Sequence, residues 1–169
     1  MKETGLQSFF KGEKEGISAL VEAYAPRLIA FLCGYVGKAD AEDLTEECFL
    51  TLLERKRRFP NEKALRTFLY RTAKHKALNF LRRTKRQTAL DENLSVNGLE
   101  EGILADERKK RLYAAMSSLT EPARSAVWLV YLEDYSYREA ASVLNCSPKA
   151  IDNTLSYAKR KLKTELSDL

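Results

Sequence analysis

The chain has 169 residues, of which 44% are hydrophobic and 31% are charged, and its formal net charge is +5. This length and hydrophobic content fit one ordinary domain or two small ones, and they exclude a largely disordered chain. No apolar run approaches the roughly 20 residues that span a bilayer, and the N-terminus lacks the apolar stretch of a signal peptide. We therefore expect a cytoplasmic protein without membrane insertion, and the positive charge favours an anionic partner.

Helical spacing of apolar residues is common along the chain, and convincing period-two alternation is absent, so the sequence predicts an all-α fold. A first helix is expected over residues 15–36, with a kink or short break at Pro26. Asp40 is the expected N-cap of a second helix, which runs to about residue 58. After the turn "FPNE", a long helix is expected over residues 63–84. Its expected inward-facing residues are Leu65, Phe68, Leu69, Ala73 and Leu81.

The sign of the charge changes abruptly in the middle of the chain. Between Lys63 and Arg86 there are nine Lys and Arg residues and no acid, whereas the stretch from Gln87 to Glu107 has six acids and no Lys or Arg. That stretch also has little apolar periodicity. We therefore expect two small helical domains joined by a flexible acidic linker, which could fold back on the basic helix and mask it. The expected boundaries are residues 1–86, 87–105 and 106–169.

The C-terminal part contains several helix start signals. Thr120 is an expected N-cap. Ser136 and Glu139 have the spacing of a capping box and predict the start of a helix of about two turns. After the break "NCS", Ser147 can cap again and Pro148 suits the first helical position. A helix, a short turn and a second helix form a helix-turn-helix, whose second helix enters the DNA major groove.

The helix that begins at Pro148 has two contrasting faces. At about 100° per residue, its apolar residues share a narrow arc that must pack on the domain. The opposite arc is cationic and can form hydrogen bonds, so we expect it to reach base edges and phosphates. An ordinary solvated amphipathic helix is the alternative for this segment taken alone. The apolar arc holds Ile151, Leu155, Ala158 and Leu162, and the predicted DNA-binding arc holds Lys149, Asn153, Ser156, Tyr157 and Arg160.

Basic and aromatic residues alternate along the long helix of residues 63–86. This combination suits single-stranded or melted nucleic acid, because rings stack on unpaired bases and cations hold the backbone. An equal alternative, from the pattern alone, is a solvated charged face over a core that contains the aromatic residues. The basic residues include Arg66, Arg71, Lys74, Lys76, Arg82, Arg83, Lys85 and Arg86, and the aromatic ones are Phe68, Tyr70 and Phe80.

The second helix carries acids beside bulky apolar residues. Glu46 and Glu47 lie close to Leu50 and Leu53, a combination that suits the docking of a basic partner helix. A plain amphipathic core helix is the alternative.

No enzymatic, cofactor or metal constellation is expected. The chain has no Gly-rich phosphate loop and no Ser, His and Asp set. Its only histidine, His75, is weak evidence for catalysis. Cys33, Cys48 and Cys146 are widely spaced, so we interpret them as small buried or half-buried residues rather than metal ligands.

Two separated blocks resemble the bacterial RNA polymerase sigma factors, specifically the extracytoplasmic-function (ECF) group of the sigma-70 family. The first block contains "DAEDLTEECFLTLLE" and "RTFLYRTAKHKALNFLRR" and resembles sigma region 2. The second, "LTEPARSAVWLVYLEDYSYREAASVLNCSPKAIDNTLSYAKRKL", resembles sigma region 4. The two blocks together cover about two-thirds of the chain, and their order makes the resemblance more specific than either motif alone.

The resemblance implies a protein without catalytic activity that binds core RNA polymerase, directs promoter-specific transcription initiation and helps to open the DNA. Region 2 would engage the polymerase clamp and the melted minus-ten element. Region 4 would engage the polymerase flap and the duplex minus-thirty-five element. Because the group commonly has anti-sigma factors, such a protein is a further candidate partner. The implied docking residues are Asp43, Glu46, Glu47, Leu50 and Leu53, and the implied region 2 DNA-binding residues are Arg66, Tyr70, Arg71, Lys74, His75, Asn79, Arg82 and Arg83.

The sequence departs from the family pattern at two places. Phe68 stands where tryptophan is common, and Asp152, Asn153 and Thr154 replace a cation-rich run in the predicted DNA-binding helix. Two other classes of function stay open. An ordinary helix-turn-helix regulator with a sensing or dimerising N-terminal domain would leave the basic helix and the acidic face without a role, and a nucleic-acid-processing enzyme or adaptor is the third alternative.

Overall fold

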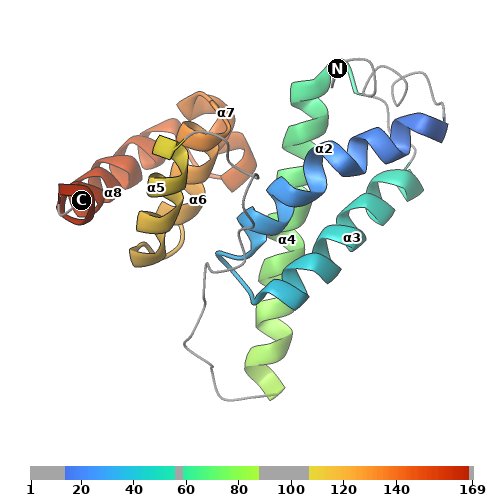
Figure 1. The fold of residues 1–169 in the computed structure, drawn as a ribbon, viewed down its shortest axis with the longest axis horizontal. Coiled ribbons are helices and arrows are strands. Elements are labelled where there is room, and N and C mark those ends of the chain that lie inside the picture. The colour runs from blue at the N-terminus through green and yellow to red at the C-terminus, as the bar shows by residue number, and fades with distance from the viewer. Residues whose placement is uncertain (1–13, 56–58, 88–106, 168–169) are drawn as a thin grey trace. The chain divides into compact units, whose positions relative to one another are not determined.

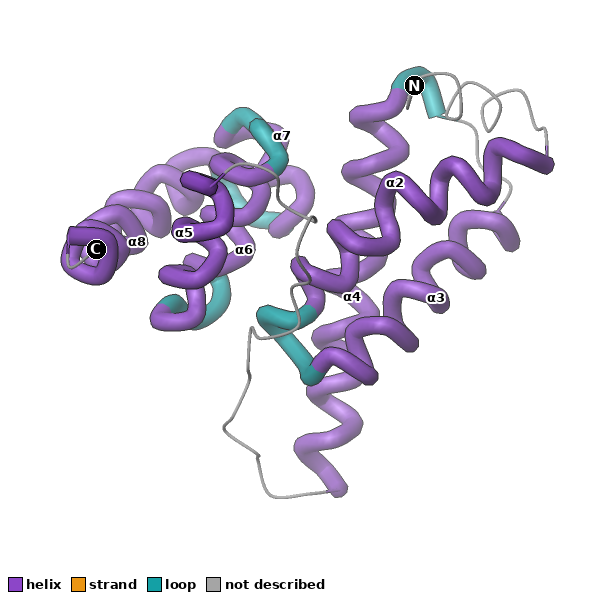
Figure 2. The backbone as a smooth tube through the Cα atoms, viewed as in Figure 1, coloured by secondary structure: helices purple, strands orange, loops and turns teal. Residues whose placement is uncertain are grey.

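The computed structural model describes residues 14–55, 59–87 and 107–167, and within these ranges all regular structure is helical (Figure 2). The predicted all-α class is thereby confirmed. The chain forms two compact units that divide near residue 98. From residue 88 to 106 the chain lies outside the described residues, and so does the expectation that an acidic linker masks the basic helix. The predicted domain boundaries therefore stay a prediction.

The N-terminal unit consists of α2 (Lys14–Leu32), α3 (Lys38–Arg55) and α4 (Glu62–Gln87), each of which packs on the other two (Figure 1). Helix α2 continues through Pro26 and ends four residues before the predicted end. Its Tyr24 and Leu28, which flank the proline, are fully buried. Packing of this kind stabilises a helix across a residue whose local preference is against it.

Two predicted helix starts need correction or refinement. Helix α3 begins at Lys38, so Asp40 lies in its first turn, where a carboxylate still favours the helix dipole, rather than at the N-cap. Helix α4 begins at Glu62, directly after Asn61. The side-chain oxygen of Asn61 accepts a hydrogen bond from the backbone N–H of Ala64 at 2.9 Å, so this asparagine caps the long helix.

Aromatic and polar contacts tie the core of the N-terminal unit together. The hydroxyl of Tyr24 donates a hydrogen bond to Glu62 Oε1 at 2.7 Å and thus joins α2 to the start of α4. Burial, followed by this hydrogen bond, raises the pKa of Tyr24 well above its ordinary value. Phe68 and Leu81 are only half-buried, contrary to expectation. The buried residues of α4 are Leu65, Leu69, Tyr70, Ala73 and Ala77.

The C-terminal unit packs several short helices and the long helix α8 around one tryptophan. Trp128 is buried and meets Tyr113 edge-on, with 5.7 Å between ring centroids. The elements are α5 (Glu107–Ala115), η1 (Met116–Ser118), α6 (Ala123–Val127), the π-helical η2 (Trp128–Leu132), α7 (Tyr137–Leu144) and α8 (Pro148–Ser167).

The predicted N-cap at Thr120 is wrong. Helix α6 begins at Ala123, and its N-cap, Pro122, has no side-chain capping bond. The preceding turn is held instead by the buried guanidinium of Arg124, which donates hydrogen bonds to the carbonyl oxygens of Met116 and Leu119. A charged donor buried against carbonyl oxygens replaces the cap that a local sequence pattern would supply.

The three cysteines are predicted to differ in reactivity in the native protein. Cys33 and Cys48 are buried and Cys146 is exposed, which corrects the expectation for the third. Burial raises the pKa of Cys33 and raises that of Cys48 to about 12. A raised pKa keeps a thiol in its unreactive neutral form at mildly alkaline pH. An aromatic disulfide reagent should therefore modify Cys146 quickly, and the two buried thiols only after unfolding. Cys146→Ser should abolish the fast phase, and fast modification of Cys48 in the native protein would contradict the assignment.

Candidate nucleic-acid interfaces and docking face

Helices α7 and α8 form the predicted helix-turn-helix, and local interactions set each of its boundaries. Ser136 and Glu139 form a complete capping box. Ser136 Oγ accepts a hydrogen bond from Glu139 N at 3.0 Å, and Glu139 Oε1 accepts one from Ser136 N at 2.8 Å. Asn145, with φ 56° and ψ 51°, ends α7 in the left-handed conformation that asparagine tolerates. Ser147 Oγ then accepts a hydrogen bond from Ala150 N at 3.1 Å, with Pro148 as the first residue of α8. The two predicted caps are thus confirmed.

Helix α8 presents the predicted residues to solvent. Its apolar arc of Ile151, Leu155, Ala158 and Leu162 is buried against the unit, as expected. Because that arc is fixed inside, the opposite arc must face outward. The outward residues are Lys149, Asn153, Ser156, Tyr157 and Arg160, all of which are exposed.

A lysine beside this arc is held by an aromatic residue that the sequence analysis did not single out. Lys159 Nζ lies 5.8 Å from the ring centroid of Tyr131, in the π-helical segment η2. Hydrogen bonding and charge interaction with Tyr131 raise the pKa of Lys159, so the contact favours the cationic form of the lysine. Lys159 and Tyr131 are far apart in sequence, so no local pattern could have revealed the contact.

Helix α4 carries a second outward polar face. Arg71, His75, Asn79 and Arg82 follow one another at intervals of three or four residues, which places them on one side of a helix. The side chains of His75 and Asn79 are in contact, with 3.2 Å between Asn79 Nδ2 and His75 Nε2. Lys74 and Arg83 flank this face on opposite sides. Arg66 is half-buried and lies nearer to the core.

Tyr70 does not belong to this face, so its predicted contact with melted bases is wrong. Its side chain has no exposed area, and its ring meets Phe31 edge-on with 5.0 Å between centroids. The sequence contained a signal for this, since Tyr70 lies three and seven residues before the inward-facing Ala73 and Ala77. Of the other aromatic residues, Phe68 packs on Phe59, with 5.4 Å between ring centroids, and stays half-buried.

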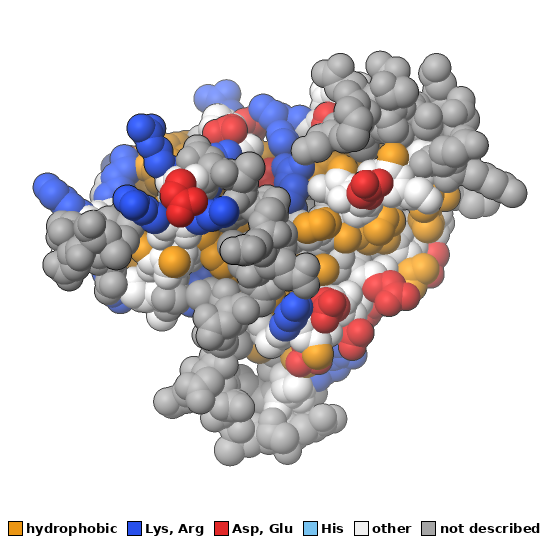
Figure 3. Space-filling model, viewed as in Figure 1, with side chains coloured by type: hydrophobic (Ala, Val, Ile, Leu, Met, Phe, Trp, Pro, Cys, Tyr) orange, Lys and Arg blue, Asp and Glu red, His pale blue; other side chains and the backbone are white. Residues whose placement is uncertain are grey.

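Helix α3 exposes the predicted docking residues. Their spacing of three or four places them along its outer side, and Leu50 and Leu53 are 51% and 38% exposed. Figure 3 shows hydrophobic side chains gathered over α2 and α3, with acidic side chains beside them. The docking residues are Asp43, Glu46, Glu47, Leu50 and Leu53, all exposed.

The sequence analysis missed the contribution of α2 to this surface. Ile17 and Val21 are apolar residues of α2, yet they are 38% and 36% exposed. Together with α3, the middle of α2 forms a shallow hollow of about 230 Å³ whose lining is almost entirely apolar. Its lining residues are Val21, Ala25, Ile29, Glu42, Thr45, Glu46, Phe49 and Leu50.

A second, polar hollow separates the acidic face of α3 from the basic face of α4. Glu47 and Lys76 approach across it, with 3.9 Å between Oε1 and Nζ. Among the described residues, no three His, Cys, Asp or Glu side chains are grouped as they would be around a metal ion. No helix in those ranges is both long enough and apolar enough to cross a membrane.

Family models match both units of the chain. The model of Sigma-70 region 2 matches residues 20–87, and that of Sigma-70 region 4 matches residues 109–162. An ordinary helix-turn-helix regulator would not account for the first match. The two matches span both outward faces described above.

Curated relatives are similar over nearly the whole chain. The ECF RNA polymerase sigma-E factor of Haemophilus influenzae is 25% identical over 94% of this chain and 92% of its own length. The ECF RNA polymerase sigma-E factor of Escherichia coli K12 is also 25% identical, over 94% of this chain and 91% of its own length.

Two solved structures have a similar fold. The sigma factor RpoE, in complex with the anti-sigma factor NepR from Bartonella quintana, gives a TM-score of 0.72 at 19% identity, over 90% of this chain and 98% of that one. CnrH, in complex with the cytosolic domain of CnrY, gives a TM-score of 0.63 at 20% identity, over 99% of this chain and 97% of that one. The two family models and the sigma-E relatives show that the chain belongs to the ECF group of the sigma-70 family, the sigma factors that direct promoter-specific transcription initiation by RNA polymerase.

Proposed function

We propose that this sigma factor divides its work among three outward faces, one on each of α3, α4 and α8. The face on α3 binds the clamp of core RNA polymerase. The face on α4 binds melted minus-ten DNA, and the face on α8 reads the duplex minus-thirty-five element while its unit contacts the flap. The observation that carries this proposal is that two separate units each expose a cationic helical face whose opposite side is buried.

The docking role of α3 rests on its combination of charge and exposed apolar area. Leu50 and Leu53 keep much of their surface in water in the free chain, which costs free energy that a partner can recover. Four exposed carboxylates precede them along α3, at positions 42, 43, 46 and 47, and favour a partner helix with basic residues. Such charges also increase the rate at which α3 encounters a partner of opposite charge.

The DNA-opening role of α4 rests on its cationic side and on the absence of acids between Lys63 and Arg86. Arg71 and Arg82 would hold the phosphates of an unpaired strand, while His75 and Asn79 offer hydrogen-bonding groups to bases that have left the duplex. Captured bases would shift the equilibrium toward the open DNA. Tyr70 takes no part, because it is in the core.

The role of α8 follows from the general geometry of a helix-turn-helix. The N-terminal residues of a recognition helix contact base edges, which assigns Lys149 and Asn153 to base readout. Arg160 lies farther along and reaches either a base or a phosphate. Asp152, exposed beside them, would repel phosphates and so limits which DNA this helix accepts.

We infer that the chain has no catalytic activity of its own and that it acts in the cytoplasm, where polymerase and promoter DNA meet. We also infer an anti-sigma factor as a partner. The two solved structures compared above are complexes, one of them with the anti-sigma factor NepR. The exposed apolar hollow between α2 and α3 offers a surface that such a protein could cover.

Reconstituted transcription tests the proposed function as a whole. The purified chain, added to core RNA polymerase and a library of genomic fragments, should yield transcripts that start at specific sites. Core polymerase alone, or core with a regulator, would lack such starts. Start sites that do not depend on the chain would overturn the proposal.

Leu50→Ala should weaken binding to core polymerase. Loss of the buried apolar area should cost about 1–2 kcal/mol, or about tenfold in affinity. Equilibrium binding to labelled core polymerase measures the change. Leu78→Ala on α4 is the matched control, because Leu78 is comparably exposed, at 41%, but lies off the docking face. Equal affinities of the two variants would remove Leu50 from that face.

Arg160→Ala should weaken binding of duplex promoter DNA by the holoenzyme. The loss should be about 1–3 kcal/mol if Arg160 reads a base, and the salt dependence should fall by about one unit if it meets a phosphate. Arg111→Ala on α5, an exposed arginine of the same unit, provides the control. Unchanged affinity together with an unchanged salt slope would exclude Arg160 from the interface.

A further inference from the structure

Asp152 is an exposed acid on the helix that the proposed function places in the DNA major groove. It lies three residues after Lys149 and four before Ser156, so the three side chains follow one line along α8. Helix α8 begins at Pro148, which places Asp152 in its second turn, within the N-terminal part of a recognition helix that contacts base edges. A carboxylate in this place faces the DNA phosphates, whose repulsion lowers the affinity for every sequence alike.

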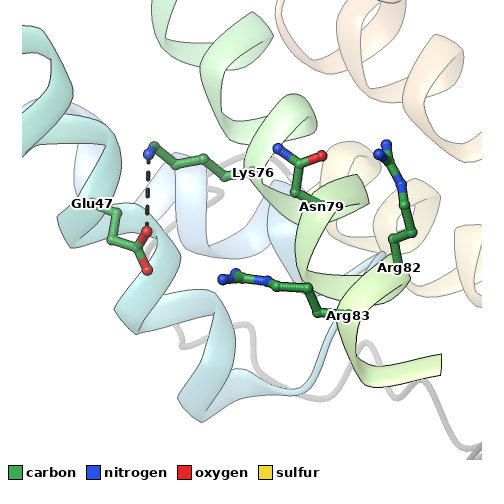
Figure 4. Close-up of a pocket in the computed structure, with 5 residues that line it drawn as sticks. All are labelled: Glu47, Lys76, Asn79, Arg82 and Arg83. Carbon is green, nitrogen blue, oxygen red and sulfur yellow. Dashed lines mark ion pairs between the residues drawn. The ribbon is translucent and has the colours of Figure 1, made fainter. Parts of the chain in front are cut away.

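The usual structural tasks of an acid do not account for Asp152. It lies beyond the first turn of α8, where a carboxylate gains from the helix dipole. Among the described residues, no side chain forms an ion pair or a hydrogen bond with its carboxylate. Other acids do have such a task. Glu139 completes the capping box of α7, and Figure 4 shows Glu47 of α3 beside Lys76, with 3.9 Å between Oε1 and Nζ.

Lys159 lies two turns farther along the same edge of α8, but it does not neutralise Asp152. Its Nζ lies 5.8 Å from the ring centroid of Tyr131. Hydrogen bonding to Tyr131 contributes most to the raised pKa of Lys159, and the charge of Asp152 contributes least. Seven residues along a helix correspond to about 10 Å, which is too far for an ion pair. The carboxylate of Asp152 is therefore free to accept a hydrogen bond from a donor outside the chain.

We propose that Asp152 determines part of the sequence preference for the minus-thirty-five element by accepting a hydrogen bond from the N4 amino group of a cytosine. An ionised carboxylate accepts hydrogen bonds and donates none. In the major groove, guanine and thymine present acceptors, and adenine presents its amino donor beside the acceptor N7. Cytosine presents an amino donor without an acceptor of its own. Asp152 thus selects cytosine at one position and rejects guanine and thymine there.

The neighbours of Asp152 fit this arrangement. Lys149, one turn earlier, offsets part of the repulsion between the carboxylate and the phosphates, and a lysine in the groove favours guanine. Asn153 has the side chain that pairs with adenine. A cationic side chain in place of Asp152 would select guanine, so the acid reverses the hydrogen-bonding class of the preferred base. This inference rests on the proposed function, because it requires α8 to lie in the major groove.

Selection from randomised duplexes tests the assignment. The full chain, bound to core RNA polymerase, is mixed with promoter duplexes whose minus-thirty-five segment is randomised, and the bound duplexes are sequenced. Wild type should enrich cytosine over guanine and thymine at one position by about 5- to 150-fold, the discrimination that one base contact supplies. Asp152→Ala should abolish the preference at that position alone. Asp152→Asn should change it to adenine, because an asparagine side chain pairs with that base.

Asp134→Asn is the matched control for the change of charge. Asp134 is exposed in the same unit but lies outside α8, and asparagine also tolerates its φ of 59°. This variant should leave the preferred bases unchanged. Each variant should unfold at the temperature of the wild type, because neither substitution removes a buried side chain.

The outcomes separate this inference from the proposed function. A preference for cytosine at one position that changes with the side chain of residue 152 supports the inference. Equal gains in affinity for all sequences, with the preferred bases unchanged, would show that Asp152 only repels phosphates, and this result overturns the inference while the proposed role of α8 stands. Enrichment of another base by wild type at the responding position also overturns it. A wild-type chain without preference anywhere in the randomised segment refutes the proposed role of α8 as well.

Discussion

Each helix of this chain has one apolar stripe, and burying that stripe determines which of its side chains stay in water. In α8, Ile151 and Leu155 lie inside, so Asn153 and Arg160 lie outside. In α4, burial of Leu69 and Ala73 leaves His75 on the outer side. The chemistry of both outward faces therefore depends on the burial of apolar side chains on the opposite side of each helix. A substitution in the stripes would rotate or loosen a face without touching any residue on it.

The features that the sequence predicted best are those that depend on interactions between residues close together in the chain. The capping box of Ser136 and Glu139, the second cap at Ser147 and the two arcs of α8 all depend on neighbours along one or two helical turns, and all are present. Fold class and the order of the elements followed from the same periodicity. These local signals agree with the tertiary structure, which is what makes the helix-turn-helix readable from sequence.

What the sequence could not predict depends on contacts between distant segments. Thr120 has the composition of a cap, but the buried Arg124 holds that turn instead. Tyr70 stands among cations in sequence, yet Phe31 of another helix encloses it. Val21 extends the apolar stripe of α2, but three helices do not cover a stripe of that width, so part of it stays in water. A sequence pattern predicts which face of a helix is apolar, but it does not predict how much of that face the neighbouring helices cover.

The distribution of aromatic residues has a practical consequence for the study of this molecule. The chain has a single tryptophan, Trp128, and it is enclosed in the C-terminal unit beside Tyr113. Selectively excited indole emission therefore reports on one half of the polypeptide alone, whereas far-ultraviolet ellipticity reports on both. Comparing the two signals during a denaturant titration would show whether the halves melt together or as independent bodies, with no label attached.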